Sequence, residues 1–457
     1  MTREECRHRA RNYVESGCFE TDLARLVARP SISQSEGNVA DLRAYLEQDL
    51  GLLLDGYGFE TRIYENPLIG APPIMTACYI ENEEFQTILI YGHGDVCNGE
   101  ASRWREGLSP CKLTREGDRL YGRGTADNKA QHLINIVSIG LLLQLNGTLG
   151  FNVKFIIEMG EEIGSPGLRE FLFEHRATLA ANVFISSDGP RLVSDIPTVF
   201  MGSRGVVDID FSVRLRANDL HSGNFGGLVA DPAILLSHAI ASITDKRGQI
   251  CIPEWRPNSL TNEIRDLLAR LPYRNHDPEW GEASLTPSER VFGWNSFAVL
   301  AMSSGTIEAP QSAISSSARG IGQLRFVVGT DVNEIMPALR RHLDDNGFDK
   351  VEVALCDVPF QATRFSIDHP WVQFVCGSVE KSTGEQPHIL PNLAGSLPND
   401  MFIDSLGLPT IWIPHSYAEC GQHGPNEHVL LSISSQAMQI MTDLFYDIRD
   451  LCHQKCL

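Results

Sequence analysis

Five short segments of the sequence place histidine or carboxylate side chains directly after an apolar run or in a glycine-rich turn. They are Ile88–Asp95, Gly122–Lys129, Ile156–Glu162, Ile185–Gly189 and Gln422–Glu427. Each has an ordinary explanation by itself, because a lone His-x-Asp pair is usually part of a loop and an Asp-Gly pair is commonly a turn. Together, they predict that several imidazole and carboxylate groups meet at one edge of a single sheet.

A divalent metal ion is the chemistry that such a group of side chains favours. Carboxylates gathered without a counter-charge raise one another's pKa values, and a bound cation removes that repulsion. Two histidines with three or four carboxylates suit zinc, manganese or cobalt. If one carboxylate is shared, this number of donors suits two metal ions better than one.

The elements that must position these side chains follow from the hydrophobic pattern. It predicts helices over 42–53 and 128–145 and strands over 59–64, 87–91, 151–159 and 183–187. This alternation predicts an α/β fold with a mostly parallel sheet. In such sheets ligands bind beyond the carboxyl ends of the strands, which is where the five segments are expected.

The pattern changes after Pro197 and changes back near residue 365. Between these points it predicts strands over 206–214, 322–328 and 351–357 and helices over 231–244 and 333–345. Residues 245–310, rich in Pro, Trp, Asn and Gly, predict an insertion with only short helical pieces. We therefore expect a discontinuous α/β domain of residues 1–197 and 365–457, interrupted by a smaller α+β domain of residues 198–364.

Composition excludes several classes of function. The 457 residues include 38 Lys and Arg against 58 Asp and Glu, a formal net charge of −20. Phosphate binding needs clustered cations, so we expect no nucleic-acid partner. The longest apolar stretch is too short to span a membrane, and the first residues lack the apolar core of a secretory signal. The 11 cysteines are scattered without a Cys-x-x-Cys pair, which indicates reduced thiols in a cytoplasmic protein.

The five segments, in this order and at this spacing, closely resemble the aminoacylase and carnosinase type of cocatalytic di-zinc peptidases. That family also includes the acetylornithine and succinyl-diaminopimelate deacylases. The resemblance spans essentially the whole chain and implies a catalytic domain in two parts and a lid domain that forms a homodimer. It implies two divalent metal ions, Zn²⁺ above all and Mn²⁺ or Co²⁺ as alternatives, with five ligands: His93, Asp127, Glu162, Asp188 and His423.

The same resemblance implies catalytic roles. Glu161 matches the general base of amide hydrolysis, and Asp95 matches the carboxylate that orients His93. His221, in the segment Asp219–Gly227, matches a lid histidine that reaches the neighbouring subunit's site and stabilises the oxyanion.

Substrate contacts are implied for Arg325, Ser312 and Ser396. The chain departs from the family pattern at Asn392–Ala394, where carnosinase relatives have Arg-Glu, and at Ile314–Ser315, where many relatives have Ile-Pro. The first departure removes a charge near the substrate, so a neutral acyl or amide substituent is an alternative to a dipeptide.

Three other classes of function fit the sequence less well. No nucleotide-binding glycine pattern and no G-x-S-x-G motif occurs, which argues against a nucleotide enzyme and a serine hydrolase. A non-catalytic binding protein on the same scaffold is disfavoured because no reactive residue is missing. Dipeptidase and N-acyl-amino-acid deacylase remain open, because both use the same metal chemistry.

Overall fold

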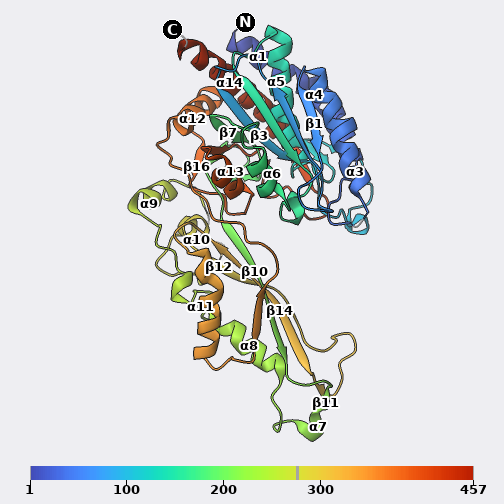
Figure 1. Cartoon of the computed structure of the whole chain (residues 1–457), viewed down its shortest axis with the longest axis vertical. Coiled ribbons are helices and arrows are strands. Elements are labelled where there is room, and N and C mark those ends of the chain that lie inside the picture. The colour runs from blue at the N-terminus through green and yellow to red at the C-terminus, as the bar shows by residue number, and fades with distance from the viewer. Residues whose placement is uncertain (1, 36, 274–276, 456–457) are drawn as a thin grey trace. The chain divides into compact units, whose positions relative to one another are not determined.

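The computed structural model describes residues 2–35, 37–273 and 277–455. The chain divides into two compact units (Figure 1). Unit 1 comprises Met1–Gly202, Phe365–Leu390 and Pro398–Leu457, and unit 2 comprises Ser203–Arg364 and Pro391–Leu397.

Unit 1 is built on a large mixed sheet. Among the described residues this sheet has eight strands, in the order β1 (Glu60–Tyr64), β2 (Ile74–Tyr79), β6 (Asn152–Glu158), β3 (Thr87–His93), β7 (Val183–Ser186), β17 (Thr410–Trp412), β9 (Thr198–Phe200) and β16 (His388–Leu390). The central strands β6, β3, β7 and β17 are parallel to one another, whereas β1, β2 and β6 pair antiparallel. The predicted α/β class with a mostly parallel sheet is confirmed at the centre of unit 1.

Helices cover both faces of this sheet. They are α1 (Arg3–Glu15), α2 (Cys18–Ala28), α5 (Lys129–Asn146), α6 (Leu168–Glu174), α12 (Pro370–Thr383), α13 (Asn399–Leu406) and α14 (Leu431–Lys455). The helix expected over 42–53 is α3 (Val39–Ala44) and α4 (Leu52–Gly56) joined by a π-helical stretch, Tyr45–Gly51. Small sheets complete the unit: β4 (Thr114–Glu116) with β5 (Arg119–Tyr121) and β19 (His428–Leu430), and β8 (Pro190–Arg191) with β18 (Ser416–Tyr417).

Strand β3 shows why the central strands are apolar throughout. Ile88 and Ile90 belong to the core that contains α1, α5 and α14. Tyr91 points to the opposite face, where its ring contacts those of Phe402 in α13 and Trp412. A strand covered on both sides gains from apolar residues at every position, so its sequence does not alternate.

Unit 2 contains an antiparallel sheet in the order β12 (Ser296–Ser303), β14 (Ser317–Phe326), β10 (Gly205–Arg214) and β15 (Glu352–Leu355). Burial alternates along β10 and β14, and their buried side chains pack against α8 (Pro232–Ile243) and α11 (Val332–Asp345). Shorter elements are α9 (Asn262–Leu268), α10 (Pro287–Phe292), α7 (Ser222–Phe225) and the two-stranded pair of β11 (Leu220–His221) and β13 (Ala313–Ile314).

The structure corrects two details of the predicted organisation. Residues 245–310 do not hold only short helical pieces, because Ser296–Ser303 form the edge strand β12 along β14; residues 274–276 of this stretch lie outside the described part. Pro391–Leu397, which the sequence assigned to the second catalytic segment, belongs to unit 2. There the Arg204 backbone N–H donates to the carbonyls of Leu393 and Gly395.

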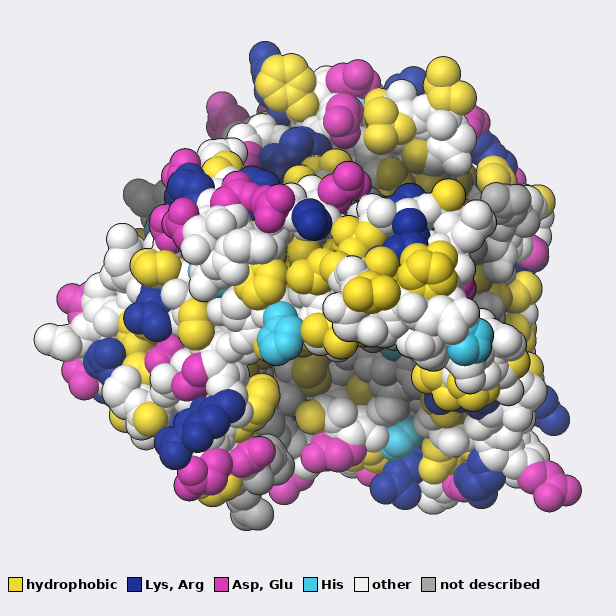
Figure 2. All heavy atoms as spheres, turned by 90° about the horizontal axis from the view of Figure 1, so that it is seen from below, with side chains coloured by type: hydrophobic (Ala, Val, Ile, Leu, Met, Phe, Trp, Pro, Cys, Tyr) yellow, Lys and Arg dark blue, Asp and Glu magenta, His cyan; other side chains and the backbone are white. Residues whose placement is uncertain are grey.

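Two further findings concern the molecular surface. None of the helices that the structure describes combines the length and hydropathy needed to cross a membrane. On the face seen in Figure 2, basic side chains are interspersed with acidic ones, and hydrophobic side chains gather between them.

Candidate active site

The first cluster of candidate metal ligands forms at the carboxyl ends of β3 and β7. His93 is the last residue of β3, and Asp188 follows β7 by two residues. Asp127 comes from the turn before α5. The Nε2 atom of His93 lies 2.9 Å from Oδ1 of Asp127 and 3.6 Å from Oδ2 of Asp188, and all three side chains are buried.

The second cluster lies on the other side of Asp127. Glu162 sits in a short helical turn after β6, and His423 in the loop after β18. Nε2 of His423 lies 3.0 Å from Oδ2 of Asp127 and 3.1 Å from Oε2 of Glu162. The two oxygens of the Asp127 carboxylate therefore face different histidines, which is the arrangement that a carboxylate bridging two cations requires.

Asp95 connects the ligands to the glutamate pair. Its Oδ1 lies 3.3 Å from Nδ1 of His93, the ring nitrogen that does not face the first cluster. The same carboxylate accepts hydrogen bonds from the backbone N–H groups of Glu161 and Glu162, at 3.2 and 3.1 Å. Asp95 thus holds the imidazole ring and the helical turn in fixed positions relative to each other.

The electrostatics of the clusters fit bound cations. Burial and the neighbouring Asp127 raise the pKa of Asp188 to about 7, and its Oδ2 makes no hydrogen bond within the described part of the chain. Burial and the nearby carboxylates of Glu162, Asp127 and Asp188 raise the pKa of Glu161, against the opposing effect of His93. Imidazole and carboxylate donors suit zinc, manganese and cobalt, and a cation would compensate these acidic groups.

The predicted substrate residues fall into two groups within unit 2. Arg325, near the end of β14, donates from Nη1 to Oγ of Ser396 at 2.7 Å and from Nε to Gln323 at 3.0 Å. Asn392, at the position of the sequence departure, accepts a hydrogen bond of 3.1 Å from Arg364. Arg325 and Ser396 are thus brought together although they are far apart in the sequence.

His221 and Ser312 form the other group. His221 pairs with Ala313 across β11 and β13, and the backbone N–H of Ser222 donates to the carbonyl of Ser312 at 3.0 Å. Both side chains are exposed. They lie beside the start of β14, whereas Arg325 is near its end, so the structure does not bring Ser312 to Arg325 and Ser396.

Comparison with known proteins identifies the family. Residues 89–447 match the peptidase family M20/M25/M40. The chain belongs to this family. The match includes both candidate clusters and all of unit 2, and it confirms the predicted relationship and the hydrolase class of this M20 peptidase.

Two relatives of the M20 peptidase carry the name Beta-Ala-His dipeptidase. The human protein is 26% identical over 388 residues, which cover 78% of this chain and 74% of that protein. The mouse protein is 32% identical over 235 residues, which cover 48% of this chain and 47% of that protein, so the mouse alignment spans about half of its length. The crystal structure of an M20 metallo-carboxypeptidase from Sulfolobus solfataricus has the same fold, with a TM-score of 0.82, 24% identity and coverage of 94% of this chain and 99% of that one.

Glu427, for which the sequence pattern predicts no role, organises the turn that carries Asp127. Its buried carboxylate accepts hydrogen bonds from the backbone N–H groups of Gly124, Ala126 and Asp127 at 2.8–3.1 Å, and from Arg123 at 2.6 Å. Glu427 is the last residue of the fifth segment, but nothing in its spacing indicated which backbone groups its carboxylate would reach.

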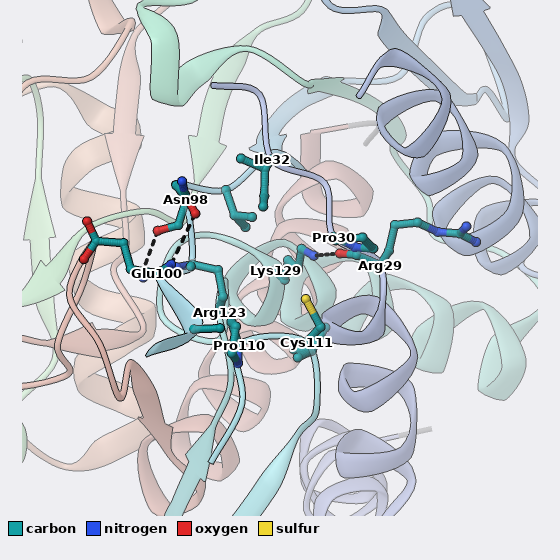
Figure 3. Close-up of a pocket in the computed structure, with 13 residues that line it drawn as sticks. Arg29, Pro30, Ile32, Asn98, Glu100, Pro110, Cys111, Arg123 and Lys129 are labelled. Atoms are coloured by element: carbon teal, nitrogen blue, oxygen red, sulfur yellow. Dashed lines mark hydrogen bonds between the residues drawn. The ribbon is translucent and has the colours of Figure 1, made fainter. Parts of the chain in front are cut away.

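Cys97 is a second residue that the sequence reasoning missed. It lies two residues beyond Asp95, and its sulfur is within reach of Glu162 and His423. Asn98, the next residue, lines a cavity of about 130 Å³ together with Arg123 and Lys129, among others (Figure 3). Lys129 donates to the backbone carbonyls of Leu26 and Arg29 at 2.9 and 2.8 Å, which fixes the start of α5 behind the ligand turn.

Proposed function

We propose that this M20 peptidase hydrolyses the amide bond of small substrates, dipeptides first, with two divalent metal ions. The observation that carries the proposal is the position of Asp127, whose two carboxylate oxygens lie 2.9 Å from His93 and 3.0 Å from His423. His93, Asp127 and Asp188 would hold one ion, and Asp127, Glu162 and His423 the other. When bound, the ions polarise a carbonyl group and lower the pKa of water.

The chain's own residues would supply the proton transfer. Glu161 stands next to the ligand Glu162, and neighbouring residues in a turn point in different directions. The Glu161 carboxylate takes a proton from the attacking water and returns it to the nitrogen of the leaving group. Asp95 keeps the His93 ring oriented, as a carboxylate partner of a metal-binding imidazole does.

Substrate recognition is assigned to unit 2. Arg325, held by Ser396 and Gln323, presents a guanidinium group that suits a substrate carboxylate. A free carboxylate is common to dipeptides and N-acyl amino acids. The names of the human and mouse relatives favour dipeptides.

We also propose a homodimer in which His221 acts in the partner's site. His221 and Ser312 lie beside Ser317, and Arg325 is eight residues further along β14, a separation of roughly 26 Å at the rise of a strand. A dipeptide does not span this distance, so both groups serve one substrate only if they come from different copies. The edge strand β12 exposes Val299, Leu300 and Met302, and an exposed apolar edge suits pairing with another chain.

We also propose a cytoplasmic location, because the 11 cysteines are scattered along the sequence without a Cys-x-x-Cys pair, as in proteins whose thiols stay reduced.

To test this proposal, the metal-loaded protein is incubated with a panel of dipeptides and N-acyl amino acids, and the hydrolysis products are analysed. We expect cleavage of dipeptides that is lost with a chelator and restored by Zn²⁺, Mn²⁺ or Co²⁺. Exclusive cleavage of N-acyl amino acids would assign a deacylase instead, and a metal-loaded protein that cleaves neither class would contradict the proposal.

A further inference from the structure

Cys97 enters the second metal-ligand cluster in a way that no other described cysteine does. Its Sγ lies 2.8 Å from Oε2 of Glu162, the same oxygen that is 3.1 Å from Nε2 of His423. The sulfur, carboxylate and imidazole donors all lie within 4.8 Å of one another. Three side chains from separate parts of the sequence thus converge on one small volume.

The loop that carries Cys97 is anchored on several sides. The backbone N–H of Cys97 donates to Oε1 of Glu162 at 3.2 Å. The side chain of Gln34 accepts from the backbone N–H of Asn98 at 3.1 Å, and its amide nitrogen lies 3.8 Å from the sulfur of Cys97. The thiol is therefore held beside the glutamate rather than left to rotate into solvent.

The two clusters differ in the number and kind of their donors. The first has a nitrogen and two carboxylates, from His93, Asp127 and Asp188. The second has the other oxygen of Asp127 together with Glu162, His423 and Cys97. Thiolate sulfur favours zinc over manganese, so the second cluster is the one whose donors select zinc.

We propose that the Cys97 thiolate is a protein ligand of the second metal ion, beside Glu162 and His423, which makes that site selective for zinc. The inference rests on the proposed two-metal function and adds to it a difference between the two sites. The thiol proton leaves to solvent when the sulfur–metal bond forms.

Cobalt absorption tests the sulfur–metal bond directly. The full-length protein is stripped of metal and titrated with Co²⁺. We expect sulfur-to-cobalt charge-transfer absorption in the near ultraviolet with one of the two equivalents. Cys97→Ser should lose this band and keep the visible cobalt bands, whereas Cys111→Ser, which removes an exposed thiol from unit 1, should keep both. A wild-type protein that binds two Co²⁺ ions without the sulfur band would overturn the assignment.

Metal affinity gives a second measurement. Loss of even an outer partner of a ligand costs about 10–100-fold in metal affinity, so Cys97→Ser should weaken one of two Zn²⁺ sites at least tenfold. Its Mn²⁺ affinity should change less than about threefold, because manganese prefers oxygen ligands. Equal losses for Zn²⁺ and Mn²⁺ would contradict a ligand role and leave Cys97 as a hydrogen-bond partner of Glu162.

Alkylation keeps the test independent of any variant's folding. In the wild-type protein, Zn²⁺ should protect Cys97 from iodoacetamide, as followed by peptide mass spectrometry, and an unchanged labelling rate counts against the proposal. Failure of the proposed function has a different signature: a wild-type protein with the sulfur–cobalt band that cleaves no substrate contradicts the hydrolase mechanism but not the ligand assignment.

Discussion

At the scale of single residues, the adjacent Glu161 and Glu162 have different surroundings, which suit the two different roles proposed for them. Glu162 is fixed by contacts to Cys97 and His423, while Glu161 lies among the ligand carboxylates, which together with burial raise its pKa. A group with a raised pKa is suited to take a proton from water and give it back. These surroundings support the proposal that Glu162 holds a metal ion and Glu161 transfers the proton.

Glu161→Gln should therefore keep both metal ions and lose at least about 100-fold in kcat, because an amide does not act as a general base. The measurements are metal content and steady-state hydrolysis. Glu170→Gln, an exposed position on α6, serves as the control and should match the wild type. Turnover near the wild-type rate in the Glu161 variant would remove this residue from the mechanism.

Among residues that are not proposed metal ligands, Glu427 is the one whose replacement we expect to reduce metal affinity most, because it positions the turn that carries Asp127. Glu427→Gln replaces an acceptor of backbone N–H groups by an amide and leaves the buried Arg123 without its carboxylate. We expect metal affinity to fall about 10–100-fold, together with a lower midpoint of thermal unfolding. Glu419→Gln, at an exposed position nearby, should change neither. Unaltered metal binding in the Glu427 variant would show that the Asp127 turn is held by other contacts.

At the scale of elements, the pairing of α1 with α14 joins the start of the described chain to its last helix (Figure 1). Asp443 of α14 is fully buried and forms ion pairs with Arg3 and Arg7 of α1. Ser382 of α12 donates to the same carboxylate. One acidic side chain therefore connects three helices of unit 1.

Asp443→Ala should destabilise unit 1 by about 3 kcal/mol, the lower end for breaking a buried ion pair, because Arg3 and Arg7 are partly exposed and regain water. The free energy of unfolding in urea measures this loss. Asp450→Ala, an exposed position on the same helix, is the comparison. A loss as small as that of Asp450→Ala would mean that apolar packing alone holds α1 against α14.

At the scale of the whole molecule, the separation of His221 from Arg325 along β14 makes a prediction about subunits. Glu161→Gln and His221→Ala should each be inactive alone, because each lacks one part of every site. In a mixed dimer, one site would combine the intact Glu161 of one copy with the intact His221 of the other. Random exchange of the two variants at equal amounts should recover about one quarter of the wild-type activity.

The recovery is measured after unfolding and refolding the two variants together, with each variant refolded alone as the control. Activity that does not rise on mixing, in samples that light scattering shows to be dimeric, would place His221 outside the partner's site. A monomeric and fully active wild-type protein would reject the shared site altogether.

The sequence by itself determined the α/β class, the family and the group of residues at the sheet edge. Apolar runs such as Ile88–Tyr91 predict buried strands locally, and the polar residues that follow them lie at the strand ends by chain connectivity. The edge strand β12 was missed because most of its side chains are exposed and its burial does not alternate. Its hydrogen bonds to β14, rather than its own pattern, make it a strand.

Only the tertiary structure decided which donors meet. Cys97 reaches Glu162 and His423 because a loop after β3, a turn after β6 and a loop after β18 approach one another, and no local pattern encodes that approach. Likewise, the segment Pro391–Leu397 joins unit 2 through hydrogen bonds from Arg204 and Arg325. Periodicity and motif order are properties of neighbouring residues, whereas contacts between distant loops depend on how the whole chain packs.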